Sequence, residues 1–439
     1  MSLKFYHVKY YFLQILLFFT TNVSGQQLDF AKYYSLFQYN YANALCVTHD
    51  NYRLVTGSTT LHTADIYYLM KLDSQGNFIW SQFGDVQLDG GYTDGRVVLE
   101  LSNGNYAVGC RTCCGSNDLF IVIYDTAGNL LQRKHYHTVE DLNITNMIEL
   151  NGSLYIFGRF STSSGFMCKT DLNADTVFIL KNLPYGLSNN KQSVLLLNDR
   201  FILGNGIYDS VATTFSPLLT IIDTTGAIIN QWHYPQITGF VESLCNTYDN
   251  GYVFSNVYPN GGLNKIDSAG NLLWSNQNIL SINQFLFSVD TNVLVVEDQY
   301  FFWYDTNGQM IRYSPNPLGL SGEASIDQNH ILLCGAVSPD SVYYAQFSDS
   351  MITNIRLVQS LILNIYPNPA STHITVLTEK FHNGEIIVTN LICQEVMRIP
   401  LHSSQQIEID IRKLSPGIYN LLLFDLSGNL NYAKFIVSR

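Results

Sequence analysis

Three cysteines close together, Cys110, Cys113 and Cys114, form the most concentrated group of reactive side chains in the sequence. A C-x-x-C spacing can hold zinc or form a redox disulfide, but a zinc site needs further ligands and no second pair has similar spacing. In an oxidising compartment we expect a local disulfide that joins Cys110 to Cys113 or Cys114. Other cysteines lie in apolar stretches and are expected to be small buried side chains: Cys46, Cys168, Cys245 and Cys334.

Aspartates recur at the start of an Asp-x-x-Gly pattern, at Asp73, Asp125, Asp223, Asp267 and Asp305. Each stands alone, without the oxygen ligands at alternating positions that a calcium loop supplies. Asp at the first position of a type I turn can accept a backbone N–H two residues on, and Gly at the fourth position takes a left-handed conformation easily. We therefore interpret these aspartates as turn formers, and no metal site is indicated.

His135, His137, Glu140 and Asp141 gather on a predicted long loop and could supply acid-base catalysis. No nucleophile lies beside them, so solvated loop polarity is the simpler interpretation. The sequence also lacks the linear motifs of serine hydrolases, zinc proteases, P-loop proteins and dinucleotide-binding folds. Because repeat folds can gather catalytic groups from several repeats, an enzyme is neither indicated nor excluded. No cofactor is indicated.

The elements that would position such groups are set by a repeat. The Asp-x-x-Gly turns recur roughly 38 to 52 residues apart, with degenerate copies near Asp171 and Ser348. A second signature, a polar corner followed by three or four apolar residues and usually a glycine, alternates with them; it begins at Asn51, Asn105, Gly152, Asp199, Gly251, Asn292 and Asn329. Seven paired units indicate a repeat architecture.

Each unit can be parsed into four short strands, as at 96–101, 106–109, 119–124 and 130–135. Four antiparallel strands with this period are typical of a β-propeller blade, whereas solenoid repeats are usually shorter. The fold class is therefore all-β, and we expect about seven four-stranded blades over residues 26–358. The stretch 32–37 should supply the outer strand of the last blade and so close the ring, with 352–357 as its competitor.

Strand parity places the tight corners on one face of the disc and the longer loops on the other. The expected longer loops are 58–65, 83–95, 110–118, 135–143, 204–217 and 257–262. Loops on a rigid scaffold commonly carry recognition, so we expect any ligand on this face. Trp80, Trp232 and Trp274 follow their turns at similar offsets, which indicates packing between blades rather than a sugar-stacking platform.

The first 25 residues have the parts of a secretory signal peptide: Lys4 and Lys9, a short apolar run, and small residues before Gly25. We expect cleavage between Gly25 and Gln26, with no transmembrane segment left after removal of the signal. The net charge of −12 and the absence of a Lys/Arg cluster in the sequence argue against a nucleic-acid partner.

After the repeats, two prolines mark a boundary, with 359–365 as a linker and 366–439 as a second domain. Its short alternating strands predict a small antiparallel β-sandwich. Three stretches carry a resemblance: Tyr366, Pro367, Asn368 and Pro369 at the start, Gly417 and Tyr419 before a strand, and Lys434 near the end.

These stretches resemble the type A C-terminal sorting domain of the type IX secretion system, over residues 361 to 439. Cys393 stands where such domains usually carry Gly, so this turn departs from the family pattern. The resemblance implies a bacterial cargo that passes the periplasm, engages the type IX translocon as partner, and is secreted or held on the cell surface. We expect a binding or adhesion module for glycan or protein; the alternative is a polysaccharide hydrolase or lyase at the propeller axis.

Overall fold

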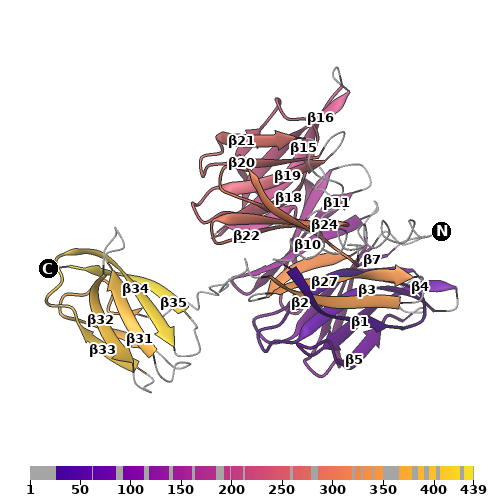
Figure 1. Ribbon diagram of the computed structural model, residues 1–439. Helices are drawn as coiled ribbons and strands as arrows, with labels where there is room; N and C mark the ends of the chain where they lie inside the picture. The colour runs from indigo at the N-terminus through magenta and orange to yellow at the C-terminus, as the bar shows by residue number, and fades with distance from the viewer. Residues whose placement is uncertain are drawn as a thin grey trace, which may run out of the picture. The chain divides into compact units, whose positions relative to one another are not determined.

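The computed structural model describes residues 26–61, 63–85, 92–112, 118–137, 142–160, 164–183, 192–197, 199–210, 213–257, 261–277, 285–318, 322–327, 330–338, 341–349, 365–377, 384–389, 395–401, 406–425 and 430–438. These residues form strands and turns without a helix, so the all-β class is confirmed (Figure 1). The chain divides into two compact units, residues 1–353 and 354–439.

Within its described residues the first unit contains seven four-stranded antiparallel sheets. In the order that we use below they are: first, β2 (Gln38–Val47), β3 (Arg53–Leu61), β4 (Ala64–Leu72) and β5 (Phe78–Phe83); second, β6 (Thr93–Glu100), β7 (Tyr106–Thr112), β8 (Asp118–Tyr124) and β9 (Leu130–His137); third, β10 (Leu142–Leu150), β11 (Ser153–Phe160), β12 (Gly165–Asp171) and β13 (Thr176–Leu183); fourth, β14 (Val194–Leu197), β15 (Arg200–Asp209), β16 (Thr214–Asp223) and β17 (Ile228–His233).

The later sheets continue the pattern. They are: fifth, β18 (Phe240–Asn246), β19 (Tyr252–Val257), β20 (Gly262–Ile266) and β21 (Leu272–Gln277); sixth, β22 (Phe285–Val289), β23 (Asn292–Val296), β24 (Tyr300–Tyr304) and β25 (Met310–Pro315); seventh, β26 (Glu323–Asp327), β27 (His330–Ser338), β28 (Ser341–Asp349) and β1 (Gln26–Tyr34). Consecutive strands therefore pair, except that the seventh sheet takes its fourth strand from the start of the described chain.

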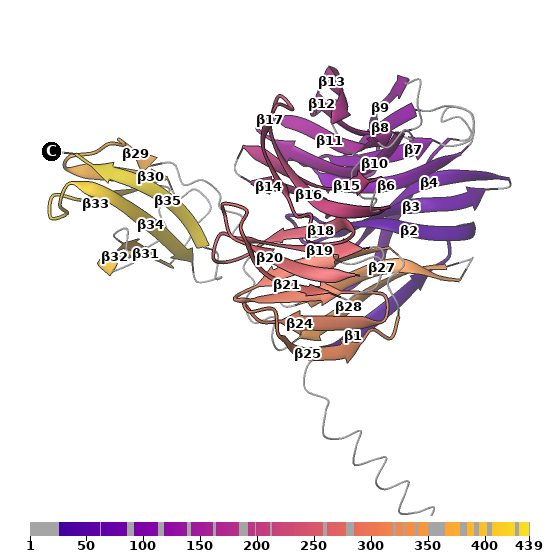
Figure 2. The ribbon, with the colours of Figure 1, turned by 90° about the horizontal axis from the view of Figure 1, so that it is seen from above.

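The strand β1 pairs antiparallel with β28 over its whole length, with Ala31 opposite Ala345 (Figure 2). This confirms in part the predicted outer strand of the last sheet, 32–37. The strand β1 begins six residues before Lys32 and ends at Tyr34, so only residues 32–34 of the predicted stretch belong to it. The competing segment, 352–357, lies outside the described residues. Tyr34 at the end of β1 donates a hydrogen bond of 2.6 Å from its hydroxyl to the carbonyl of Gly76 in the first sheet.

Successive sheets share apolar cores. Val97 and Ile121 of the second sheet, for example, pack with Ile144 and Ile156 of the third, and all four are buried. A buried aliphatic side chain stabilises the fold by about 1.5–3 kcal/mol, so each of these residues contributes to holding the two sheets together. The sixth and seventh sheets meet where the indole Nε1 of Trp303 donates to Asp349 Oδ2 over 3.1 Å.

The seventh sheet also packs on the first, which makes the arrangement a ring. Tyr68 and Met70 of the first sheet share a buried cluster with Leu332 of the seventh. Arg53, only 2% exposed, bridges the same interface through an ion pair of 2.6 Å with Asp327. The first unit is therefore propeller-like.

The Asp-x-x-Gly turns have the predicted chemistry. In the fifth sheet, Asp267 Oδ1 accepts hydrogen bonds from the N–H groups of Ala269 and Asn271 at 2.9 and 2.8 Å, and Gly270 has φ +88°. The same two backbone bonds recur at Asp73, Asp125, Asp223 and Asp305. The interpretation of these aspartates as turn formers is confirmed.

The second unit is built from two sheets over its described residues. One contains β29 (Ile365–Tyr366), β30 (His373–Leu377) and β33 (Gln406–Asp410); the other contains β32 (Glu395–Leu401), β31 (Gly384–Thr389), β34 (Gly417–Asp425) and β35 (Leu430–Val437). Side chains from both sheets, including Ile374, Ile386 and Leu421, form one buried core. Cys393 lies outside the described residues.

Candidate functional site

The two ends of the strands differ, as strand parity requires. The Asp-x-x-Gly turns and the corners between first and second strands lie at one end, which we call the corner end. At the other, the loop-bearing end, second strands pass to third strands and the chain crosses between sheets. One predicted loop there, 204–217, is shorter than expected, because β15 and β16 stay paired as far as Asp209 opposite Thr214. Tyr208 and Phe215 support this extension with ring centroids 5.1 Å apart.

A bulge in the first strand of several sheets re-aims a polar side chain near the loop-bearing end. The extra residue of the bulge is Asn43 in β2, Arg96 in β6 and Thr145 in β10. Glu242 lies in the equivalent bulge of β18. Bulges commonly redirect side chains beside functional sites. The strands thus place polar groups at matching positions of neighbouring sheets.

Three arginines gather at this end of the second and third sheets. Arg111 lies directly opposite Asp94 in the pairing of β7 with β6, and Arg159 lies near the end of β11. Arg96 Nη1 and Arg111 Nη2 lie 3.2 and 3.5 Å from Asp94 Oδ2. Burial and then the charge of Arg96 lower the pKa of Arg159. We call Arg96, Arg111, Arg159 and Asp94 the arginine cluster.

Asp94 is the shared counter-ion of this cluster. Besides the two arginines, the amide Nδ2 of Asn43 donates to its Oδ1 over 2.5 Å and to the carbonyl of Gly95 over 3.0 Å. The Nε atoms of Arg96 and Arg111 are buried and have no hydrogen-bond acceptor among the described residues. Over the part of the chain that the structure describes, the cluster therefore has more positive than negative charge and two donors without an acceptor, which suits an anion.

Exposed tyrosines accompany the cluster. Tyr39 and Tyr41 lie on β2, the strand that carries Asn43, and each is 55% exposed. Tyr92, 37% exposed, precedes β6 and donates from its hydroxyl to the carbonyl of Thr63 over 3.1 Å. The loop-bearing end thus combines cationic donors with aromatic surface.

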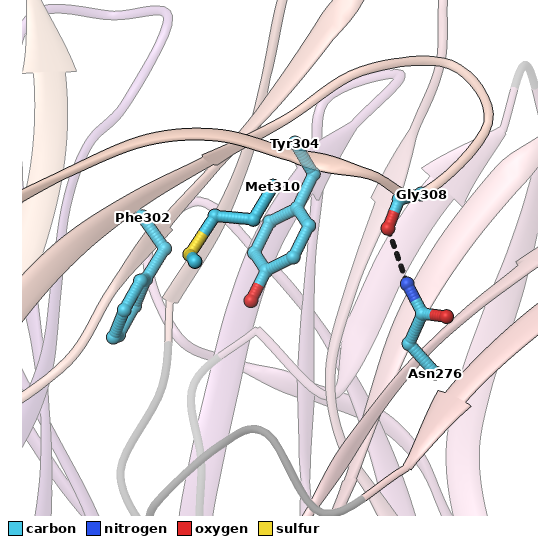
Figure 3. A pocket seen from close by; sticks show the side chains of 5 residues that line it. All are labelled: Asn276, Phe302, Tyr304, Gly308 and Met310. Carbon is cyan, nitrogen blue, oxygen red and sulfur yellow. Dashed lines mark hydrogen bonds between the residues drawn. The ribbon is translucent and has the colours of Figure 1, made fainter.

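A pocket of about 290 Å³ lies between the fifth and sixth sheets (Figure 3). Its lining, Asn276, Phe302, Tyr304, Gly308 and Met310, is mostly apolar. Asn276 Nδ2 donates to the carbonyl of Gly308, and burial, reinforced by the charge of Glu297, raises the pKa of Tyr304 to about 12. These contacts join two sheets, and they offer no charged group for chemistry.

His49, Asp50 and Glu100 at the corner end lie close enough to share a cation. Glu100 already accepts from the backbone N–H of His49 and contacts its ring Nδ1, both at 2.6 Å. His49 is largely exposed. The contacts join the corner of the first sheet to the second, which accounts for the group without a metal.

Trp80, Trp232 and Trp274 lie between sheets, as predicted. A Cβ atom added to Gly128, Gly270 or Gly308 would meet the indole of the preceding sheet at 3.1, 2.4 or 2.8 Å respectively. The indole Nε1 of Trp274 also donates to the carbonyl of Thr306 over 2.8 Å. Each tryptophan covers the turn glycine of the next sheet.

The predicted reactive residues have mixed outcomes. Cys168, Cys245 and Cys334 are buried as expected, and Cys46 is partly buried. Cys110 is buried, but Cys113 and Cys114 lie outside the described residues, so the disulfide stays a prediction.

The prediction that His135 and His137 lie on a long loop is wrong. Both belong to β9, because pairing with β8 continues to His137 opposite Asp118. His135 stacks on Phe120 with ring centroids 4.2 Å apart, which ties it to the sheet. Glu140 and Asp141 lie outside the described residues, as do Gly25 and the residues before it, while Gln26 begins β1.

The predicted sorting-motif residues come together in the second unit. Tyr366, on β29, is 48% exposed and precedes Pro367 and Pro369. Asn368 Oδ1 accepts from the N–H of Ile436 over 2.9 Å, which joins the start of the unit to β35.

The other two stretches lie on neighbouring strands. Tyr419 is buried against Phe435 and donates from its hydroxyl to the carbonyl of Ser415 over 2.9 Å. Gly417 pairs with Val437, and Lys434 pairs with Asn420. The three stretches thus meet through β34 and β35.

Solved structures and one family model resemble this chain. No curated protein matches the chain. The structure of PorZ, a bacterial surface component of the type IX secretion system of Porphyromonas gingivalis, is similar with a TM-score of 0.44 and 10% identity; the match covers 92% of this chain and 59% of that one. The WD40 domain of Neurospora crassa Pan2 is similar with a TM-score of 0.49 and 10% identity; the match covers 74% of this chain and 96% of that one.

The extracellular domain of a putative hybrid two component system of B. thetaiotaomicron gives a TM-score of 0.44 and 15% identity, covering 94% of this chain and 59% of that one. No helix in the described part of the chain has the length and hydrophobicity to cross a bilayer. Residues 364–438 match the family model of the secretion system C-terminal sorting domain. This match confirms the resemblance carried by the three stretches and implies export to the cell surface or the medium.

Proposed function

We propose that the protein is a type IX secretion cargo whose first unit is a seven-bladed β-propeller that acts as a binding or adhesion module for glycan or protein. The observation that supports binding is the state of Asp94. This carboxylate accepts from Asn43 and pairs with Arg96 and Arg111, so it serves as a counter-ion that holds the two arginines at the loop-bearing end.

The test is a glycan and protein array with the purified protein, run beside an activity screen on polysaccharides. Saturable binding without depolymerisation supports the proposal. Depolymerisation that is lost with a carboxylate variant would replace it with the second candidate, a polysaccharide hydrolase or lyase at the axis. That candidate is favoured by Glu242, a buried carboxylate on the first strand of the fifth sheet.

The domain plan belongs to the proposal. A signal peptide, 1–25, is cleaved between Gly25 and Gln26; the propeller occupies 26–358; a linker, 359–365, leads to a sorting β-sandwich, 366–439. The route passes through the periplasm, and the sandwich engages the translocon. Fusing residues 361–439 to an exported reporter in a secretion-competent host should place the reporter outside the cell. A reporter that remains in the periplasm would refute this route.

A further inference from the structure

We infer that the arginine cluster binds the carboxylate groups of an acidic glycan, a polymer that contains uronic acid. This inference rests on the proposed binding function and names its ligand class.

The charges of the cluster require a partner. Among the described residues two guanidinium groups share one carboxylate, and the contacts of Asp94 with Arg96 and Arg111, at 3.2 and 3.5 Å, are single and long. Arg159 adds a third positive charge beside Arg96. Guanidinium binds carboxylate best through two parallel hydrogen bonds, which neither arginine makes with Asp94. An added carboxylate would supply the second acceptor that a paired guanidinium contact needs.

The setting favours an anion over other ligands. The chain as a whole has a net charge of −12, so a group of three arginines is a local reversal of sign. Such a reversal attracts anions over a distance of about 10 Å at moderate salt. The side chains of Arg96 and Arg111 are 22% and 37% exposed, so they are open to a ligand.

The neighbouring side chains indicate a sugar rather than an acidic peptide. Tyr39 and Tyr41 present exposed rings on the strand whose Asn43 reaches Asp94. A tyrosine ring offers a flat apolar surface with a hydroxyl at its edge, which matches the apolar face and hydroxyl rim of a pyranose. A long-chain glycan could place carboxylates on the arginines and rings on the tyrosines at once.

The test compares four probes on the purified protein by isothermal titration calorimetry: polygalacturonate, the same polymer fully methyl-esterified, poly-glutamate and dextran. The ester keeps the sugar backbone and removes the charge. We expect binding to polygalacturonate that weakens as salt rises, and at least tenfold weaker binding to the other three. Equal binding to the ester would overturn the inference, and preference for poly-glutamate would replace the glycan with an acidic protein.

Variants locate the site. Arg96→Gln and Arg159→Gln should each weaken polygalacturonate binding about 10- to 100-fold, because each removes charge-assisted hydrogen bonds. Tyr41→Ala should weaken polygalacturonate but not any residual poly-glutamate binding. Arg200→Gln is the matched control, since Arg200 is exposed at the corner end and should leave affinity unchanged. Thermal melting confirms that each variant is folded.

The outcomes separate the two proposals. If polygalacturonate binds but is unaffected by either arginine variant, the site assignment fails. If no polyanion binds while the array returns another ligand, the inference fails and the binding function stands. If the array returns nothing and polysaccharide is cleaved, the binding function itself fails.

Discussion

Replacing Gly270 with alanine tests the packing between sheets most sharply. Gly270 has φ +88°, and an added Cβ would lie 2.4–2.5 Å from three ring atoms of Trp232. The left-handed backbone costs alanine about 1–2 kcal/mol, and overpacking against the indole adds about 1–3 kcal/mol. We therefore expect a loss of about 2–5 kcal/mol in the free energy of unfolding.

Gly104→Ala is the matched control. Gly104 has φ +85°, and an added Cβ would meet no heavy atom within 4 Å, so only the backbone cost of about 1–2 kcal/mol remains. Urea unfolding followed by tryptophan fluorescence measures both variants, with the slope checked to be unchanged. Equal losses at the two positions would refute the assignment of Trp232 as the cover of the next turn.

Two further predictions concern single side chains. Tyr34→Phe should lower the free energy of unfolding by about 0.5–1.5 kcal/mol, because it removes the hydrogen bond to Gly76. Tyr33→Phe, at an exposed position, should change the free energy of unfolding little. Equal urea midpoints for the two variants would contradict this prediction. Burial acts to raise the pKa of Asp249, but hydrogen bonds, chiefly from Lys265, lower it to about 2. Its stabilisation should therefore be complete above about pH 4 and be lost as pH falls through 2, so the stability advantage of wild type over Asp249→Asn should shrink on acidification; a constant advantage would exclude this linkage.

The turns and the closing strand could be predicted from sequence because their chemistry is local. The hydrogen bonds of the turn at Asp267 and Gly270 are made within five residues. The segment of β1 lies in the sequence where each later repeat has an outer strand. The positions of strand ends were harder. Gly57 and Gly158 resemble strand ends in sequence, yet an added Cβ at each would lie 1.8 or 2.2 Å from a carbonyl oxygen of the facing first strand. These glycines mark close approach at a bulge, so the strands continue past them.

The arginine cluster could not be predicted, because its members come from three strands and two sheets. Arg111 and Arg159 do follow the glycine of the second signature in consecutive repeats, at Gly109 and Gly158. Arg111 lies two residues after Gly109 and Arg159 one residue after Gly158, so aligning the repeats on this glycine would still have left the two arginines one position apart. Nothing in the sequence showed that Arg96 is a bulge residue, since bulges depend on pairing with the neighbouring strand.

The central claim is that the first unit is a closed ring, and a cross-link between β1 and β28 tests it most directly. Ala31 lies directly opposite Ala345, so cysteines at both positions should form a disulfide that mass spectrometry detects between the two peptides. Cysteines at Ala31 and Ala336 are the control, because Ala336 lies on β27, which does not pair with β1. A disulfide in the first pair alone is predicted; none there, or equal yields in both, would contradict the ring.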